Sequence, residues 1–326
     1  MREPLDRRER LALVNTVLAA RRYFLDGATK SEIATELGLS RFKVARLLDE
    51  ALRDGIVRIE IDAVPEIDDV LSRELAVALG IRSAVVVRTV EGPGEFQRSQ
   101  LGRAAASVLA DSLDDDDVLG ISWGRTLHSM IGHMPQLPGC AVVQIVGIVP
   151  SLELNVNSLE LVRRLAARAG GAVYPLPVPL IVEDAAVAAS LRADPHVART
   201  IAMFPKVTRA LVGIGAWTRG GSTLRASLSD GDAAALDAAG AVADCCSVVL
   251  DADGQEVRAA GIPDRCIAIG GDELRQVPDV VALSAGEGKV EAIRAALRSG
   301  LIHRLVTSED TARALLAGRP IASRAS

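Results

Sequence analysis

Aromatic residues are scarce in this chain of 326 residues: Phe, Trp and Tyr together make up 2% of it, whereas hydrophobic residues make up 49%. The core must therefore be packed with aliphatic side chains. Charged residues account for 24% of the sequence, and the net charge is −5. This composition is ordinary for a soluble globular protein with a sizeable core.

The sequence also lacks cysteine pairs with CxxC spacing and His/Cys groups with the spacing of zinc ligands. The cysteines are thus expected to be buried apolar residues in a reducing compartment, and no metal or other cofactor is expected. There is no charged and apolar leader, and no apolar run has the ~18 residues needed to cross a bilayer. We therefore predict a cytoplasmic protein with no membrane partner. The cysteines are Cys140, Cys245, Cys246 and Cys266.

The charge is unevenly distributed along the chain. Residues 1–61 contain 12 Lys and Arg against 10 Asp and Glu, whereas residues 62–326 contain 25 against 32 and carry a net charge of −7. Only the N-terminal part is thus suited to bind the phosphates of a nucleic acid. Because its positive excess is small, DNA binding would depend on local basic clusters and on oligomerisation. A length of 326 residues suits a small module joined to a larger domain.

The first sixty residues have the pattern of three helices, at 8–25, about 30–37 and 41–53. Thr29 and Glu32 have the spacing of a capping box at the start of the second helix. Gly38 suits the left-handed end of that helix, and the Ser40 hydroxyl can cap the third. Two helices joined by a tight glycine turn predict a helix-turn-helix.

The third helix carries basic residues at its exposed N-terminal end, where a helix-turn-helix enters the major groove and contacts guanine edges or phosphates. The following segment, residues 55–61, alternates like a short strand and predicts a wing. A generic three-helix bundle with solvated arginines is the alternative, and we consider it less favoured because caps, turn and charge coincide. The predicted DNA-binding residues are Ser40, Arg41, Phe42, Lys43 and Arg46.

The remaining chain has the pattern of a larger α/β domain, with a parallel sheet covered by helices on both faces. We place the boundary near Pro65, with a winged helix-turn-helix domain at 1–61, a linker at 62–69 and the larger domain at 70–326. Strands are predicted at 84–90, 118–122, 141–147, 172–174, 210–214, 247–250, 266–269, 280–283 and 304–307. Helices are predicted from Val70 to Leu79 and at 96–112, 158–169, 233–239, 289–298 and 309–317.

Ligands of such sheets bind at the carboxyl ends of the strands, so the loops there are the candidate sites. The loop at 120–126 combines small residues, hydroxyls and the start of a helix, which suits an anion, although a plain strand-to-helix turn explains it equally well. The loop at 282–289 adds Gly286 and Lys289, a lysine able to reach the same crevice. The segment 212–215 lacks the third glycine and the acidic residue of a dinucleotide site, which excludes a nicotinamide cofactor.

Other polar residues have weaker signals. Gln144, Asn155 and Asn157 lie in an apolar region, where they suit sugar hydroxyls as well as ordinary loop hydrogen bonds. The carboxylates of residues 114–117 have no cation-ligand pattern and are expected to form a solvated loop. The scattered histidines are expected on the surface or in the core, without metal partners. These are His128, His133, His196 and His303.

The stretch YFLDGATKSEIATELGLSRFKVARLLDEALRDGIVRIEI resembles the N-terminal domain of the SorC family of sugar-responsive bacterial regulators. This resemblance implies a DNA-binding role for Ser40, Arg41, Lys43 and Arg46. Family members usually have serine where this chain has Ala45, so one possible hydroxyl contact to a base is missing.

The larger domain resembles the effector domain of the same family in the segments GISWGRTL, LVGIGAW and SAGEGKVEAIRAALRSGLIHRLVTSEDTARALL. The resemblance covers nearly the whole chain and implies a fold related to sugar-phosphate isomerases and deaminases, without retained catalysis. By that resemblance, Ser122, Gly124, Thr126 and Lys289 would hold a phosphate or an equivalent polar group of the effector. Two departures, at 147–148 and at 248–250, touch the sugar-facing wall, so the effector's identity is not implied.

The leading interpretation is a dimeric or tetrameric regulator that binds a pseudo-palindromic operator under the control of a sugar or sugar phosphate. The alternatives are a sugar-phosphate isomerase or deaminase with an appended DNA-binding head, for which Asp251 and Asp253 are candidate bases, and a protein-interaction module. We expect no enzyme activity. The predicted effector-binding residues are Ser122, Gly124, Arg125, Thr126, Gln144, Asn155, Asp251, Gly286 and Lys289.

Overall fold

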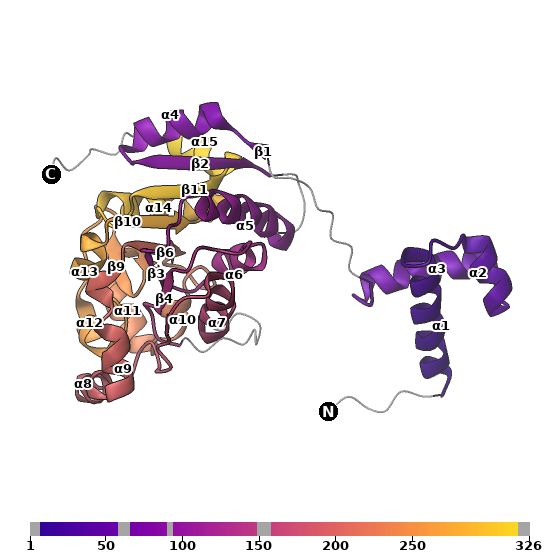
Figure 1. Ribbon diagram of the computed structural model, residues 1–326, viewed down its shortest axis with the longest axis horizontal. Helices are drawn as coiled ribbons and strands as arrows, with labels where there is room; N and C mark the ends of the chain where they lie inside the picture. The colour runs from indigo at the N-terminus through magenta and orange to yellow at the C-terminus, as the bar shows by residue number, and fades with distance from the viewer. Residues whose placement is uncertain (1–6, 58–65, 90–93, 149–157, 319–326) are drawn as a thin grey trace. The chain divides into compact units, whose positions relative to one another are not determined.

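The computed structural model describes residues 7–57, 66–89, 94–148 and 158–318, and the chain divides into two compact units, Met1–Ala63 and Val64–Ser326 (Figure 1). Residues 66–69, which the sequence analysis assigns to the linker, form a short strand and the start of a helix in the larger unit. No helix in these ranges is long and apolar enough to cross a membrane.

The smaller unit contains three helices, α1 (Arg7–Phe24), α2 (Lys30–Leu37) and α3 (Arg41–Arg53). The predicted caps are confirmed: Thr29 and Glu32 form a capping box, Gly38 ends α2 at φ 63°, and the Ser40 hydroxyl accepts from the Lys43 amide at 3.1 Å. Their common core consists of aliphatic side chains, namely Ala19, Ala20, Ile33, Ala34, Val44, Leu47, Leu48 and Ala51. The α2–turn–α3 segment is therefore a helix-turn-helix.

The predicted wing has a different outcome. Gly55, Ile56 and Val57 form a turn and bend after α3 rather than a strand, and the Val57 amide donates to the Ala51 carbonyl at 2.9 Å. Residues 58–61 lie outside the described residues. Gly55 at φ 72° reverses the chain directly after the helix, so the alternation of the sequence does not produce a strand at its start.

The larger unit is built on an eight-stranded sheet in the order β1-β2-β11-β10-β6-β3-β4-β5. All neighbouring strands are parallel except β1, which pairs antiparallel with β2 at the edge. The α/β fold with a mostly parallel sheet is thus confirmed. The strands are β1 (Glu66–Ile67), β2 (Ser83–Arg88), β3 (Val118–Ile121), β4 (Ala141–Gln144), β5 (Val173–Tyr174), β6 (Arg209–Gly213), β10 (Asp279–Leu283) and β11 (Arg304–Ser308).

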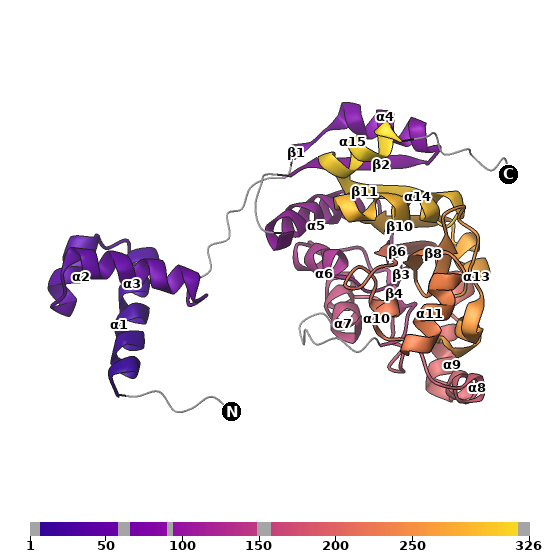
Figure 2. The same cartoon turned by 180° about the vertical axis from the view of Figure 1, so that it is seen from behind.

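Alternating side chains of the strands enter two separate cores. On β6, for example, Leu211 packs into the core under α5 (Gly94–Ala110), α6 (Arg125–Gly132) and α7 (Ser158–Ala169), whereas Val212 packs into the opposite core. The opposite face is covered by α4 (Asp69–Leu79), α14 (Val290–Arg298), α15 (Glu309–Ala317) and a small sheet. Figures 1 and 2 show α4 and α15 together beside β2.

The small sheet consists of β7 (Gly215–Ala216), β8 (Ala241–Cys245) and β9 (Val248–Asp251) in antiparallel order. The sequence analysis assigns 247–250 to the parallel sheet and predicts neither β7 nor β8, so this part is corrected. The strand predicted at 266–269 is also wrong, because Cys266 and Ala268 form only single bridges, to Ile181 and Val146.

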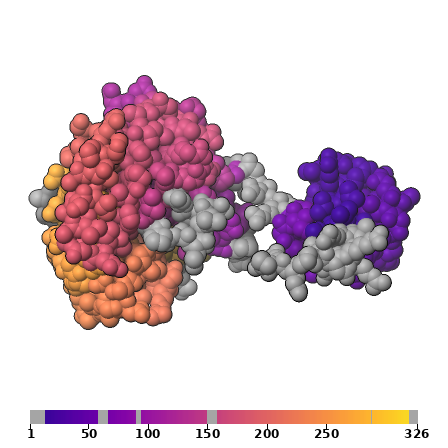
Figure 3. Space-filling view, turned by 90° about the horizontal axis from the view of Figure 1, so that it is seen from below, coloured from indigo at the N-terminus to yellow at the C-terminus, as the bar shows by residue number. Residues whose placement is uncertain are grey.

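In Figure 3 the visible face of the larger unit is formed largely by the middle of the chain, coloured pink to orange. This part of the chain includes α8 (Ala185–Ala193), α9 (Pro195–Ile201) and α11 (Asp230–Ala238). Of these, only α11 is predicted by the sequence pattern. Three short helices and three 3-10 turns complete the described part of the unit. The helices are α10 (Thr223–Ala226), α12 (Ile262–Arg265) and α13 (Gly271–Gln276), and the turns are Phe204–Lys206, Ala259–Gly261 and Glu287–Lys289. All four cysteines are free and buried, as expected.

Candidate functional site

The exposed start of α3 is the candidate DNA-binding surface. Because the Ser40 hydroxyl caps the helix, the first turn is fixed, and Arg41 and Phe42 are exposed on it, with Phe42 at 89%. Lys43 is half-buried, and the Arg46 side chain is 65% exposed, at 3.4 Å from Glu50 one turn further. The structure thus brings the five predicted residues together at one end of one helix, where guanidinium and ammonium groups can reach phosphates or base edges.

A cavity of about 1080 Å³ lies at the carboxyl ends of the parallel strands in the larger unit. Residues that follow β2, β3, β6, β10 and β11 line it, including Thr89, Ser122, Ile214, Ser284 and Asp310. From β3 the chain proceeds to β4 and β5 on one side, and from β6 to β10 and β11 on the other. The cavity therefore opens where the strand order reverses, the usual ligand position in such sheets.

The loop from Ser122 to Thr126 forms one wall of this cavity. Gly124 has φ 154°, a backbone conformation that L side chains rarely adopt, and it precedes α6 without any side-chain cap. The first amides of α6 are therefore available to an anion, and Arg125 and Thr126 add a guanidinium and a hydroxyl. The Ser122 hydroxyl accepts from the Gly213 amide at 3.4 Å, which ties this loop to the end of β6.

The loop from Ser284 to Lys289 forms the facing wall. Gly286, at φ 121°, donates its amide to the Thr311 hydroxyl at 2.9 Å, which fixes the loop against α15. Lys289 donates to the carbonyl of Ile214, and burial lowers the pKa of its ammonium group. The Ser284 hydroxyl is buried and has no hydrogen-bond partner in the structure. A ligand in the cavity can satisfy that hydroxyl.

The sequence analysis misses Asp244, which lies on β8 and lines the same cavity. Its carboxyl is buried, and Oδ1 has no hydrogen-bond partner among the residues that the structure describes. Burial raises the pKa of Asp244, while the Ser222 hydroxyl and the Lys289 ammonium partly offset this. A Cβ at Gly215 would lie 2.1 Å from Oδ1, so only glycine fits beside this carboxyl. The available signal is an acidic residue within the apolar run at 241–250.

The charges that line the cavity favour an anionic ligand. Arg98, Arg125, Lys289 and Arg313 are cationic, whereas Asp244 and Asp310 are the anionic residues of the lining. Arg313 is paired with Glu309 at 2.7 Å, which leaves three cations against two carboxylates. A positive excess here contrasts with the net charge of −7 of residues 62–326.

Two predicted effector residues lie elsewhere. Gln144 is buried, but its amide donates to the Val146 carbonyl and the Ser158 hydroxyl and accepts from the Leu176 amide, so it fixes loops rather than lining the cavity. The Asp251 carboxylate accepts from the amides of residues 253 and 255 and closes the turn after β9. Neither residue is among those that line the cavity, so the structure does not bring them together with the other predicted effector residues. Asn155 and Asn157 lie outside the described residues.

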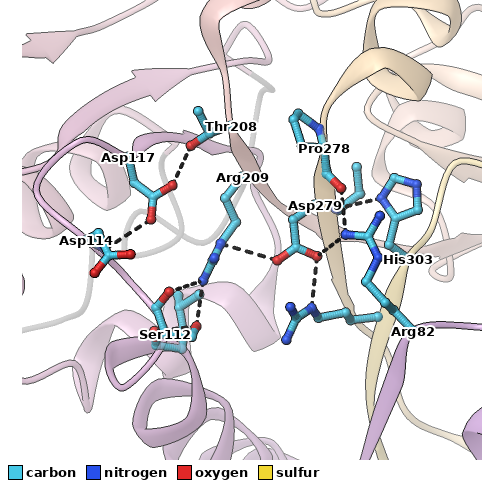
Figure 4. Close-up of polar contacts among 12 residues, drawn as sticks. Arg82, Ser112, Asp114, Asp117, Thr208, Arg209, Pro278, Asp279 and His303 are labelled. Atoms are coloured by element: carbon cyan, nitrogen blue, oxygen red, sulfur yellow. Dashed lines mark hydrogen bonds and ion pairs between the residues drawn. The ribbon is translucent and has the colours of Figure 1, made fainter.

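The four carboxylates at 114–117 lie at the opposite, amino end of the sheet (Figure 4). Asp117 accepts from the Thr208 hydroxyl at 2.6 Å and from the Asp114 amide at 3.1 Å, and Asp115 accepts from the Gly139 amide. They therefore connect loops. Within the described ranges, no three His, Cys, Asp or Glu side chains are placed to hold a metal ion.

An arginine-rich cluster lies beside them. Asp279, the buried first residue of β10, is 2.9 Å from Arg304, 3.3 Å from Arg209 and 3.5 Å from Arg82 (Figure 4). Arg209 also donates to the carbonyl and hydroxyl oxygens of Ser112. The buried Asp279 carboxylate is thus paired with arginines from three segments of the chain, which is the arrangement expected of a structural cluster.

The chain is similar over most of its length to known regulators. Residues 66–317 match the family model described as "Putative sugar-binding domain". The chain is 33% identical over 317 residues to the transcriptional regulator LsrR of Klebsiella pneumoniae subsp. pneumoniae, covering 94% of this chain and 95% of LsrR. It is 31% identical over 308 residues to the erythritol catabolism regulatory protein EryD of Brucella abortus, covering 93% and 96%.

Among solved structures, the full-length sorbitol operon regulator SorC from Klebsiella pneumoniae superimposes with a TM-score of 0.71 at 28% identity and covers 94% of this chain and 99% of that one. The similarity therefore extends over both units, which favours a regulator over an enzyme with an added head. The chain belongs to the SorC family of sugar-binding transcriptional regulators.

Proposed function

We propose that the protein binds operator DNA through α3 and that a small, anionic, hydroxylated effector, a sugar phosphate, binds in the cavity and changes its affinity for DNA. The proposal is carried by two buried polar atoms of the cavity, Asp244 Oδ1 and Ser284 Oγ, which have no partner within the described structure. Burial of unpaired polar groups is costly, so their presence in a cavity favours a ligand that hydrogen-bonds to them.

The roles of the two walls follow from their chemistry. The anionic group would lie against Lys289, Arg125 and the first amides of α6, where positive charge and helix dipole coincide. A carboxylate accepts two hydrogen bonds from neighbouring hydroxyls, so Asp244 would bind the sugar part, and Ser284 would bind a further hydroxyl.

We further propose that the protein binds its effector without converting it. An isomerase or deaminase needs a positioned general base. Asp251 and Asp253, the two candidate bases named from the sequence, are not among the residues that line the cavity, and Asp251 Oδ1 accepts from two backbone amides. Incubation of purified protein with sugar phosphates, followed by chromatographic analysis, should return them unchanged. Turnover that is lost in the Asp244→Asn variant would revive the enzyme interpretation.

The main test is fluorescence anisotropy of DNA from the protein's own promoter region, with and without a panel of free and phosphorylated sugars. One compound should shift the affinity for DNA, and Lys289→Met should abolish the response to it while leaving binding without effector intact. A response to the free sugar equal to that of its phosphate would contradict the anionic part of the proposal.

The DNA-binding surface is tested with variants of one helix. Arg41→Ala and Arg46→Ala should weaken operator binding and reduce its salt dependence, because each removes a positive charge near the DNA. Arg53→Ala is the matched control, since Arg53 is also an exposed arginine of α3 but lies at its other end. Equal effects of all three changes would argue against recognition by the start of α3.

Operator recognition by one small module provides few base contacts, so we propose that the protein acts as a symmetric dimer or tetramer. Two linked half-sites multiply the affinity of a single module. The effector can act only through its different affinity for the arrangements of this oligomer. Operator fragments with one half-site should bind much more weakly than fragments with two.

A further inference from the structure

Helix α4 presents a strip of four exposed residues on the side opposite to its contact with the sheet. Leu71, Leu75 and Leu79 are buried in the core of the larger unit. The opposite strip consists of Val70, Arg73, Glu74 and Val77. Val70 and Val77 are 67% and 84% exposed. The spacing of three and four residues places all four side chains on one face of the helix.

The order of this strip, apolar–basic–acidic–apolar, is symmetric about the point between Arg73 and Glu74. When a second α4 lies antiparallel across that point, Val70 of one copy faces Val77 of the other, and Arg73 faces Glu74. A two-fold axis repeats both contacts, as it does in any isologous interface. The strip is therefore complementary to itself in charge and in hydrophobic character.

Nothing in the described part of the chain satisfies the two charges of the strip. Arg73 and Glu74 have no ion-pair partner there, although the neighbouring charges of this edge are paired: Arg88 contacts both Glu66 and Asp68. Unpaired adjacent charges of opposite sign between two exposed valines are suited to a partner that carries the same pattern in reverse.

We propose that α4 is a two-fold self-association surface and that its occupant is α4 of a second copy of this chain. This inference rests on the proposed function, in which the regulator acts as a symmetric oligomer, and it names one surface of that oligomer. Four side chains from each copy cover less than the roughly 800 Å² per partner of a standard interface. The α4 contact therefore forms one step of assembly alongside a second contact surface.

The test is sedimentation velocity of the full-length protein over a range of concentrations. Arg73→Glu places two carboxylates opposite each other in both repeats, so it should weaken one assembly step by about tenfold or more. Glu74→Arg should do the same through two guanidinium groups. The exchanged double variant, Arg73→Glu with Glu74→Arg, restores opposite charges and should recover the wild-type assembly.

A mixture of the two single variants is a sharper form of the same test. Across the two-fold axis, the chain with two acidic residues faces the chain with two basic residues, so the mixture should recover the assembly step that each single variant weakens alone. Arg168→Glu on α7 is the matched control, since it reverses an exposed arginine outside the strip and should leave assembly unchanged. All four variants should keep the wild-type melting temperature, because the changed side chains are exposed.

Single variants with wild-type assembly would overturn the α4 proposal, as would a double variant or mixture that fails to recover. If the wild-type chain is an oligomer in those cases, the oligomeric regulator stands and only its interface is misplaced. If the wild-type chain is a monomer both alone and on the operator, the oligomeric part of the proposed function fails with it.

Discussion

The two ends of the parallel sheet differ in whether their buried polar groups have partners. At the amino end, Asp279 forms ion pairs with Arg82, Arg209 and Arg304. Arg209 Nε and Asp279 Oδ2 do not have hydrogen-bond geometry, but they lie 3.3 Å apart and form an ion pair. In the cavity at the carboxyl end, Asp244 Oδ1 and Ser284 Oγ have no hydrogen-bond partner among the described residues. The buried carboxylate at one end is paired, whereas the other end has two unpaired buried polar atoms, which the proposed ligand would satisfy.

This difference suggests that the amino end of the sheet contributes to stability and that the cavity at the carboxyl end serves the proposed function. Pairing at the amino end holds the starts of β6, β10 and β11 in register, so changes there should destabilise the fold. Unpaired groups in the cavity lower the stability of the free protein and can favour the bound state. Substitutions at the two ends should therefore have effects of opposite sign on the free energy of unfolding.

The largest effect is expected for Asp279→Ala. The change leaves three arginines, of which Arg209 is the most buried, without their carboxylate, and breaking a buried pair in this way costs about 3–5 kcal/mol. Urea unfolding should show this loss. Asp116→Ala is the control, because Asp116 is an exposed carboxylate at the same end of the sheet and should change the free energy by less than about 0.5 kcal/mol.

A smaller loss of stability is expected for Gln144→Leu. The change removes the acceptor of the buried Leu176 amide, and an unsatisfied buried donor costs about 1–3 kcal/mol. Because Gln144 lies outside the cavity, the DNA response to effector should stay within about twofold of wild type. Gln276→Leu, at an exposed glutamine at the end of α13, is the control for stability. A folded Gln144→Leu variant that no longer responds to the effector would support the original prediction that Gln144 binds it.

Elements with local signals could be predicted from the sequence. The capping box at Thr29, the left-handed Gly38 and the Ser40 cap depend on neighbours within four residues, so their pattern is sufficient to place α2 and α3. The loops at 122–126 and 284–289 could also be placed, because each follows a continuous apolar strand. What they bind remains a proposal.

Elements fixed by distant contacts could not be predicted. The segment 266–269 has the residues of a strand, but its backbone bonds are divided between Ile181 and Val146, so no ladder forms. Asp244 enters the cavity only because the short strand β7 pairs with β8. Gln144 has the chemistry of a sugar-binding residue, and only the position of Leu176, 32 residues away, shows that its amide is already occupied.

At the cavity end, Asp244→Asn is expected to stabilise the free protein at pH 7, by on the order of 1 kcal/mol, because it removes a charge from a buried position. Folding raises the pKa of Asp244, so the folded state binds the proton more tightly than the unfolded state. The free energy of unfolding of the wild-type protein therefore decreases as pH rises above 3.8, the ordinary pKa of this carboxyl.

The advantage of the Asn variant should accordingly disappear at acidic pH, which thermal melts from pH 7 downward can measure. Effector affinity should fall by roughly tenfold or more, since a charged acceptor is lost. An Asn variant that is less stable than wild type at pH 7 would mean that the carboxylate is already stabilised without ligand, contrary to the comparison of the two ends.

The smallest change in stability is expected for Ser284→Ala. The hydroxyl has no partner in the described part of the chain, so its removal should alter the free energy of unfolding by no more than about 0.5 kcal/mol, with a gain favoured over a loss. Its proposed partner is a ligand hydroxyl, and the loss of one neutral hydrogen bond should weaken effector binding about two- to tenfold. Ser112→Ala is the matched control at the amino end, where the hydroxyl accepts from Arg209, and it should lower stability without affecting the effector. A hydroxyl that bonds to a ligand and to no protein group should affect effector binding but not the free energy of unfolding. If Ser284→Ala and Ser112→Ala changed both quantities alike, the proposed distinction between the two ends of the sheet would be wrong.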